Sequence, residues 1–160
     1  MYKKILVPID ILEDELSQEL ITHIEQIAQV GKPEIHFLTV IPNAELFFGI
    51  EFAAIPEKFK DSSERTRLAF IALQDMIKDA KIPDEQIVCN VGVGNAKDEI
   101  LEYARQIDAD LIAIASHRPN VSSYLLGSTA SSIVRHAKNV GIGDPLVVKK
   151  PFENKGLSTQ

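Results

Sequence analysis

Apolar residues fall into five short runs along the chain, each bounded by polar or turn-forming residues. The runs are rich in β-branched side chains and nearly continuous in apolar residues, which is typical of strands buried on both faces of a sheet. We expect these strands at Lys4–Pro8, Glu34–Ile41, Gln86–Val91, Asp110–Ala115 and Pro145–Lys149.

Between these runs, apolar residues recur three or four positions apart, which is the spacing of amphipathic helices. The spacing predicts helices over Asp14–Val30, Ser62–Lys81, Asn95–Ile107 and Ser128–Ala137. Asn95 is the expected N-cap of its helix, with Glu99 in the following turn.

Strands that alternate with helices form a parallel sheet with right-handed crossovers. The sequence therefore predicts an α/β protein with a Rossmann-like open sheet of five parallel strands and helices on both faces. The strand order is expected to be flavodoxin-like or a close relative of it. A ligand of such a fold lies outside the carboxyl ends of the strands, at the topological switch point.

Length and composition fit one globular domain of ordinary size. The chain has 160 residues, of which 45% are hydrophobic and 25% charged, close to the average of soluble proteins. We expect the domain to span residues 1–150, followed by a flexible tail over 151–160 that has little apolar content. The net charge of −6 argues against a nucleic-acid partner, because neutralising phosphates requires basic side chains.

The chain is expected to be cytoplasmic. Its one cysteine, Cys89, cannot form an internal disulfide, which agrees with a reducing compartment. Cys89 lies in an apolar run, and this favours a small buried side chain over a reactive thiol. The apolar run near the N-terminus is too short for a signal peptide, and none approaches the roughly eighteen residues of a membrane span.

One connection is unusually long and apolar. Residues 42–60 read PNAELFFGIEFAAIPEKFK, and a connection of this length is usually functional or disordered. Its apolar content argues against disorder. It is expected to form a flap over its own domain or, alternatively, a subunit interface or a lid.

The segment after the fourth expected strand has the features of a phosphate site. Gly127 precedes Ser128 and Thr129 at the start of a short expected helix. The free N–H groups of a helix N-terminus, together with two hydroxyl groups, suit a phosphate. His117 and Arg118 lie in the same loop and could add positive charge.

Four segments of the chain resemble the universal stress protein family. They are Tyr2–Asp10, Asp110–His117, Leu125–Ser128 and Val134–Ala137, and the resemblance extends over about residues 2 to 149. It implies the adenine nucleotide alpha hydrolase-like form of the Rossmann fold and the binding of ATP, with or without Mg²⁺.

The phosphate loop departs from the pattern G-x2-G-x9-G-[ST] of the ATP-binding members. Ala115 and Arg118 stand in place of the two leading glycines, and only eight residues separate Arg118 from Gly127. The loop is more similar to that of the small F- and G-type members, in which it is likewise altered. Arg118 lacks the positive-φ freedom of glycine, so phosphate contacts are expected to shift toward side chains.

The resemblance also implies which residues hold the nucleotide. In the phosphate half these are Ser116, His117, Arg118, Gly127, Ser128 and Thr129. In the adenosine half, Pro8 would line the base pocket, Val40 would bind through its backbone, and Asp10 and Gly94 would lie near the ribose. Two alternatives stay open here, because Asp10 could instead cap the following helix, and Gly92 and Gly94 could be ordinary turn glycines.

No other catalytic or metal motif is found in the sequence. Gly127 is not followed by the lysine of a Walker A loop, and Gly92-x-Gly94 does not continue as a dinucleotide fingerprint. The four histidines lack the spacing of metal ligands. No residue stands out as a general base, so the sequence favours a protein that holds ATP over an enzyme, with slow hydrolysis at most.

Three functions are therefore weighed. The favoured one is an ATP-binding regulatory module of the stress response. The alternatives are a partner-binding module that has lost its nucleotide, because both leading glycines are absent, and a slow ATPase. The resemblance further implies a homodimer through the last strand, and the sequence leaves open whether dimers assemble into a tetramer.

Overall fold

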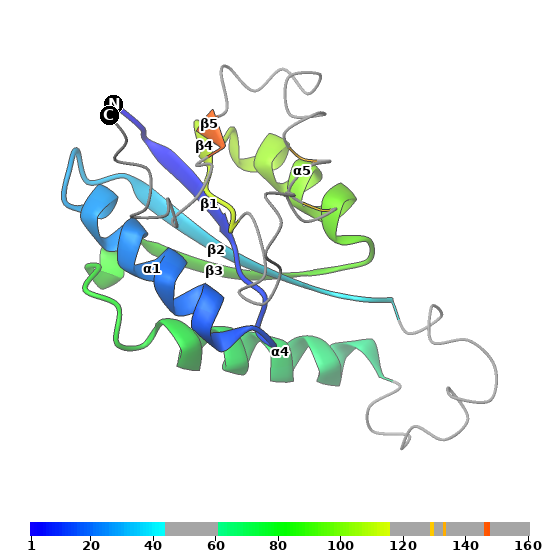
Figure 1. Cartoon of the computed structure of the whole chain (residues 1–160). Helices are drawn as coiled ribbons and strands as arrows, with labels where there is room; N and C mark the ends of the chain where they lie inside the picture. Colours follow the sequence, from blue (N-terminus) through cyan, green and yellow to red (C-terminus); the bar gives the residue numbers. More distant parts are fainter. Residues whose placement is uncertain (44–60, 116–128, 130–132, 134–145, 148–160) are drawn as a thin grey trace, which may run out of the picture.

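The computed structural model describes residues 1–43, 61–115, 129, 133, 146 and 147. These residues form a sheet of five parallel strands in the order β3-β2-β1-β4-β5 (Figure 1). The strands are β1 (Lys4–Pro8), β2 (Glu34–Ile41), β3 (Ile87–Val93), β4 (Leu111–Ile112) and β5 (Leu146–Val147). The expected Rossmann-like sheet is confirmed.

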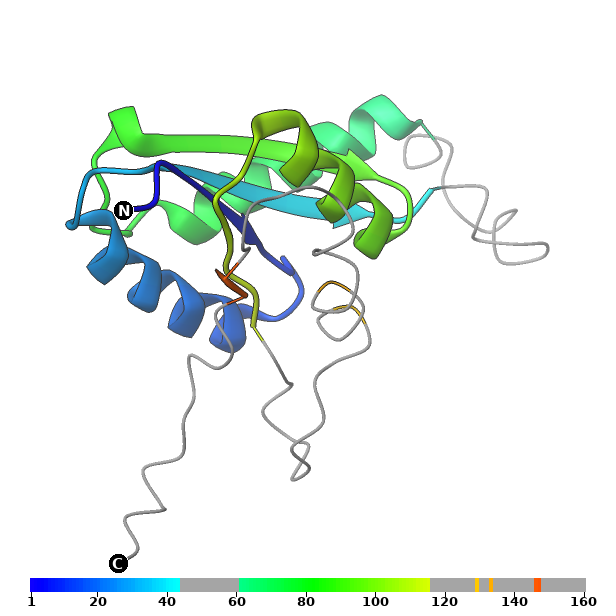
Figure 2. The same cartoon turned by 90° about the horizontal axis from the view of Figure 1, so that it is seen from above.

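The strand order places the switch point between β1 and β4. The chain builds outward from β1 to β2 and β3, which run side by side in Figure 2, and then crosses back to place β4 on the other side of β1. This order is the close relative of the flavodoxin order, not the flavodoxin order itself.

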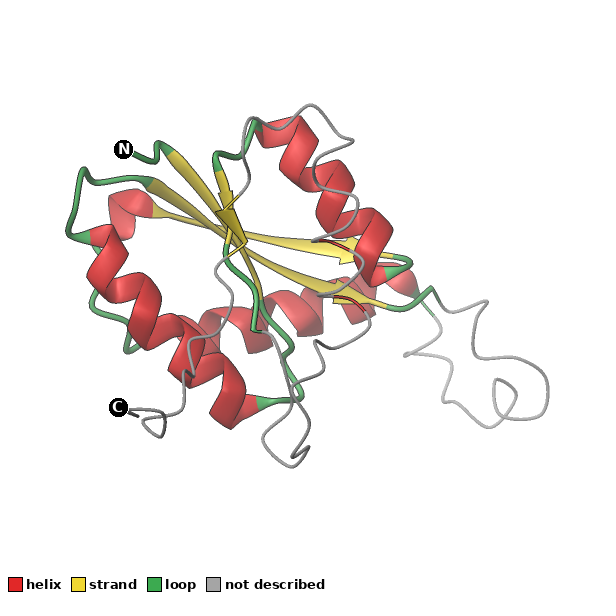
Figure 3. Ribbon diagram, turned by 45° about the horizontal axis from the view of Figure 1, so that its top comes forward, coloured by secondary structure: helices red, strands yellow, loops and turns green. Residues whose placement is uncertain are grey.

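The helices cover both faces of the sheet (Figures 1 and 3). Helices α1 (Asp14–Ala28) and α4 (Ser62–Ile77) pack on one face, and α5 (Ala96–Ile107) packs on the other. Of the helix expected at 128–137, the structure describes Thr129 and Ile133, both helical. The apolar connection (from 44 onward), the expected tail and most of the last expected strand lie outside the described residues.

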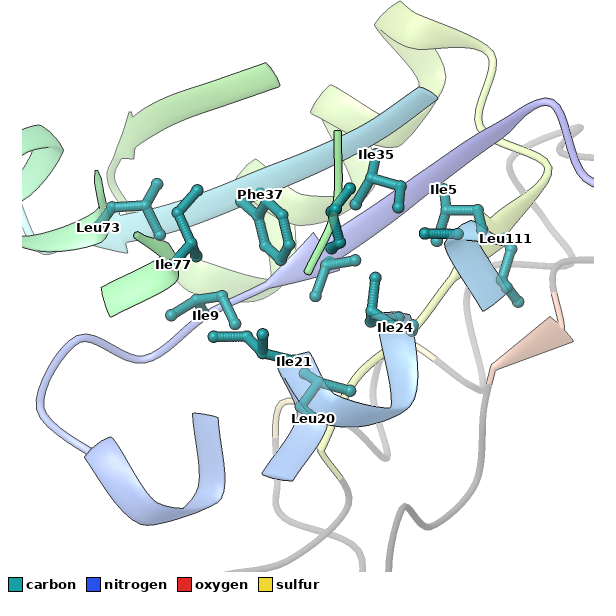
Figure 4. Close-up of a cluster of buried hydrophobic side chains, with 14 residues drawn as sticks. Ile5, Ile9, Leu20, Ile21, Ile24, Ile35, Phe37, Leu73, Ile77 and Leu111 are labelled. Carbon is teal, nitrogen blue, oxygen red and sulfur yellow. The ribbon is translucent and has the colours of Figure 1, made fainter. Parts of the chain in front are cut away.

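Alternation along the strands divides the core into two clusters. Ile5 and Val7 of β1 face α1 and α4 and join the cluster drawn in Figure 4, in which Phe37 of β2 is fully buried. Leu6 points to the opposite face and joins Leu38 against α5. Side chains of a strand alternate between faces in this way, so β1 contributes to both cores.

Several predicted boundaries are wrong by a few residues. Gln86 was expected to open a strand, but it ends the 3-10 turn η2 (Asp84–Gln86), where its buried amide donates to the Ala28 and Pro33 carbonyls at 3.2 and 2.8 Å. The fourth strand was expected over Asp110–Ala115, but only Leu111–Ile112 pair as a strand. Helices α1 and α4 end at Ala28 and Ile77, which are the last buried residues of each helix, before the predicted Val30 and Lys81.

The start of α5 is confirmed. Asn95 is the N-cap, and its side-chain oxygen accepts a hydrogen bond from the Asp98 N–H at 3.3 Å. The helix ends at Ile107, and its C-cap Asp108 is a left-handed residue with φ of 55°. Within the described part of the chain, no helix is both long enough and apolar enough to cross a membrane.

Candidate functional site

The carboxyl ends of β1, β2 and β3 come together at one edge of the sheet. The Ile9 N–H donates to the Leu38 carbonyl at 2.8 Å, and the Gly94 N–H donates to the Ile41 carbonyl at 2.9 Å. The register pairs Pro8 with Leu38 and aligns Val40 with Gly92. Four residues predicted to hold the adenosine half of a nucleotide (Pro8, Asp10, Val40, Gly94) therefore lie at the ends of three neighbouring strands, of which β1 borders the switch point.

Within the described residues, the main-chain N–H and C=O of Val40 face β1 but bond to none of its residues. In β2, odd-numbered residues such as Ile41 bond to β3, and even-numbered residues such as Leu38 bond to β1. Val40 is the next even-numbered residue, and no main-chain hydrogen bond joins it to the loop that follows β1. Its N–H and C=O therefore face the β1 side without a main-chain partner among the described residues there, so a planar ligand with one acceptor and one donor could bind both.

Asp10 follows β1 and holds its carboxylate in a fixed position. Oδ1 accepts a hydrogen bond from the Leu12 N–H at 2.9 Å, while the Asp10 carbonyl accepts from the Glu13 N–H and the Ser17 hydroxyl. Within the part of the chain that the structure describes, Oδ2 has no hydrogen-bond partner. The side chain is exposed, so this oxygen can accept a hydrogen bond from a ligand hydroxyl.

The alternative reading of Asp10 as the helix cap is wrong. Helix α1 begins at Asp14, and its N-cap is Glu13, which makes no side-chain capping bond. Asp10 instead forms an Asx turn, in which its carboxylate accepts the hydrogen bond from the N–H of Leu12, two residues later. The turn orients the carboxylate and leaves Oδ2 without a hydrogen-bond partner in the part of the chain that the structure describes.

Pro8 and Val40 place their side chains on the same face of the sheet. Pro8 comes two residues after Leu6, which packs against α5, and Val40 packs against the same cluster. Both are half-buried. Together they form a small apolar surface at the strand ends, on the α5 side.

The two glycines at the end of β3 lie against a carboxylate of α5. A Cβ atom at Gly92 would come within 3.2 Å of Glu99 Oε2, and one at Gly94 within 3.2 Å of Glu99 Oε1. Gly94 also has φ of +141°, which side chains rarely tolerate. Gly94 is thus a turn residue, while Gly92 lies inside β3 and provides room for Glu99.

Two polar side chains near the strand ends were missed by the sequence reasoning. Glu99 was treated only as a helix residue, because its contact with Gly92 and Gly94 depends on how α5 packs. Arg65 of α4 donates from Nη2 to the Pro42 carbonyl at 2.9 Å, just beyond β2, and its Nε is buried without a partner among the described residues. No local pattern marks either position.

The phosphate half of the predicted site lies mostly outside the described residues. This holds for Ser116, His117, Arg118, Gly127 and Ser128. Thr129 is helical and half-buried, and Ile133, one turn later, is fully buried in the α5-side core. Ala115 is half-buried and packs against the α1-side core. The described residues contain no group of three His, Cys, Asp or Glu side chains that could hold a metal ion.

Cys89 does not take part in this edge. It is half-buried in β3, it packs against the α1-side core, and burial raises the pKa of its thiol. A raised pKa keeps the thiol protonated at neutral pH, which supports its interpretation as an apolar packing residue.

Comparison with known proteins agrees with this architecture. The model of the universal stress protein family matches residues 1–139. The chain is 37% identical over 137 residues to universal stress protein G of Shigella flexneri, which covers 86% of this chain and 94% of that protein.

Solved structures show the same fold. Universal stress protein UspA from Lactobacillus plantarum has a TM-score of 0.62 at 24% identity, over 84% of this chain and 92% of that one. A universal stress protein in complex with cAMP has a TM-score of 0.55 at 20% identity, over 84% and 89% of the two chains. From the family match and the relative in Shigella flexneri, we conclude that the chain belongs to the universal stress protein family.

Proposed function

We propose that the protein is an adenine-nucleotide-binding regulatory module of the stress response, with ATP as its ligand. The observation that carries the proposal is the pair of unused groups at the strand ends. The main-chain N–H and C=O of Val40 face the β1 side of β2, and the carboxylate of Asp10, in the loop that follows β1, has one oxygen unpaired among the described residues.

These groups suit adenosine. The Watson–Crick edge of adenine carries one acceptor and one amino donor, which match the N–H and C=O of Val40. The apolar surface formed by Pro8 and Val40 suits the flat face of the base. A ribose hydroxyl is a donor, and the exposed oxygen of Asp10 is an acceptor for it.

The phosphates would extend toward the helix that contains Thr129. In this proposal Gly127, Ser128 and Thr129 bind them through N–H and hydroxyl groups, and Ser116, His117 and Arg118 supply the polar side chains of the opposite loop. ATP would bind with or without Mg²⁺. We further propose a cytoplasmic homodimer through β5, which is the terminal strand of the sheet, with tetramer formation open to regulation by ATP.

A relative with bound ligand supports an adenine compound. The universal stress protein solved with cAMP has the same fold as this chain. The opposing consideration is the pair Ala115 and Arg118, which replace glycines of the ATP-binding pattern and favour the alternative of a partner-binding module without nucleotide. We expect neither replacement to remove the adenosine half, because Pro8, Asp10 and Val40 lie on other strand ends.

Isothermal titration with ATP tests the proposal. The wild type is expected to bind ATP, and Asp10→Ala is expected to weaken binding at least about tenfold, because a hydrogen bond to a charged group is worth roughly 1.5–3 kcal/mol. Asp14→Ala is the matched control, since it removes an exposed carboxylate from the first turn of α1, and it is expected to leave the affinity unchanged. A flat titration of the wild type at millimolar ATP would favour the partner-binding alternative.

A further inference from the structure

Ser17 is a polar residue on the buried face of α1. The residues of this face have the spacing of an amphipathic helix and are Ser17, Leu20, Ile21, Ile24 and Ala28. Ser17 is only 4% exposed. A buried hydroxyl costs free energy unless it is hydrogen-bonded, so the partner of this hydroxyl indicates what the residue does.

The hydroxyl of Ser17 bonds outside its own helix. A serine within a helix commonly donates to the carbonyl four residues earlier, which for Ser17 is that of Glu13. Here the hydroxyl donates to the Asp10 carbonyl instead, seven residues earlier, at 2.9 Å. Ser17 therefore connects the first turn of α1 to the loop that follows β1.

Asp10 is held by three hydrogen bonds although its side chain is exposed. Its carbonyl accepts from the Ser17 hydroxyl and from the Glu13 N–H, at 2.9 and 3.1 Å. Its Oδ1 accepts from the Leu12 N–H at 2.9 Å. An exposed side chain ordinarily keeps its rotamer freedom, whereas these bonds fix both the main chain and the carboxylate of Asp10. They orient Oδ2, which has no hydrogen-bond partner among the residues that the structure describes.

We infer that Ser17 is a positioning residue for the ribose of the bound nucleotide and that it acts through Asp10. The inference rests on the nucleotide site proposed above, in which Oδ2 of Asp10 accepts a hydrogen bond from a ribose hydroxyl. An acceptor that is already oriented loses less conformational freedom when the ligand binds. Ser17 contributes by holding the main chain from which this carboxylate extends.

Titration with ATP and with 2′,3′-dideoxyATP tests this role, because the second compound lacks both ribose hydroxyls. The wild type is expected to prefer ATP about tenfold, and in Ser17→Ala this preference is expected to fall about threefold, because a neutral hydrogen bond that holds Asp10 is lost. Binding of the dideoxy compound is expected to stay unchanged. Thr22→Ala is the control, since the Thr22 hydroxyl makes the same kind of bond in α1, to the Gln18 carbonyl at 2.9 Å, and it is expected to keep the wild-type preference.

A double variant separates positioning from a general effect of Ser17 on the fold. The ATP affinity of Asp10→Ala combined with Ser17→Ala is compared with that of Asp10→Ala alone. The two affinities are expected to be equal, because the carboxylate that Ser17 helps to orient is already absent. A further loss of affinity in the double variant would overturn the inference. Ser17→Cys, which has a weak S–H donor, replaces Ser17→Ala if that variant does not fold.

The possible outcomes separate this inference from the proposed function. A wild type that prefers ATP, with the same preference in Ser17→Ala and Thr22→Ala, overturns the role of Ser17 alone. An equal loss of ATP and 2′,3′-dideoxyATP binding in Ser17→Ala also overturns it, because the serine would then support the fold and not the ribose contact. A wild type that binds both compounds equally well keeps the nucleotide site but overturns the positioning of the ribose. A wild type that binds no nucleotide overturns the proposed function and this inference together.

Discussion

At the scale of single residues, Asp110 joins the N-terminus to the sheet. Its Oδ2 accepts hydrogen bonds from the Lys3 and Lys4 N–H groups at 2.7 and 2.9 Å. These bonds connect residues 107 and 106 positions apart in the sequence and hold β1 beside β4. The same two bonds hold the pKa of Asp110 below its usual value, with a smaller contribution from the nearby positive charges.

The lowered pKa predicts how Asp110 contributes to stability. A carboxyl whose pKa is lower in the folded state stabilises the fold above its unfolded pKa and loses that contribution as the pH falls. Asp110→Asn is therefore expected to lower the free energy of unfolding at pH 7, with the difference from wild type shrinking below about pH 4. Urea unfolding at pH 7 and at pH 3 measures the difference in the free energy of unfolding, and Asp14→Asn is a control at an exposed position. If Asp110→Asn lowers the free energy of unfolding equally at pH 7 and pH 3, the ionised Asp110 carboxylate does not stabilise the fold.

At the scale of elements, the outer edge of β3 is protected against pairing. β3 is a terminal strand, and its odd-numbered N–H groups face away from β2. The Ile87 N–H already donates to the Asp84 carbonyl, and the Val91 N–H donates to the side chain of Asn90 at 2.9 Å. Occupied donors discourage a second chain from adding a strand.

We therefore expect Asn90→Val to promote association beyond the wild-type assembly. Valine frees the Val91 N–H and raises the β-propensity of an apolar edge. Asn90→Asp is the matched variant, because its carboxylate can still accept from that N–H, and it is expected to behave as the wild type. Sedimentation velocity at several protein concentrations distinguishes the two. If both variants sediment as the wild type, the side chain of Asn90 does not protect the edge.

The elements that could be predicted from sequence are those with strong local signals. β1 and β2 have continuous apolar runs, and α5 has both an N-cap and a periodic face, so their positions were correct. Gln86 was misplaced because its buried amide is satisfied by carbonyls of Ala28 and Pro33, which are distant in sequence. The contact of Glu99 with Gly92 could not be predicted either, since it depends on the packing of α5 against β3.

At the scale of the whole molecule, the parallel sheet assembles the candidate site. Pro8, Val40 and Gly94 are far apart in sequence, and the parallel register of β1, β2 and β3 brings their strand ends to one edge. The family resemblance predicted these residues, but the geometry adds two things to it. Among the described residues, the main-chain groups of Val40 have no partner in the loop after β1, and Asp10 is held by a turn instead of capping α1.

We propose that the edge formed by the carboxyl ends of β1, β2 and β3 holds an adenine nucleotide. Mass spectrometry of the small molecules released when the purified protein is denatured tests this directly. ATP is expected in the released fraction, which would also mean that any hydrolysis is slow. Release of ADP or AMP would keep the site but favour a slow ATPase. Release of no nucleotide, together with a flat ATP titration, would exclude a nucleotide at this edge and indicate a protein that acts through its surfaces.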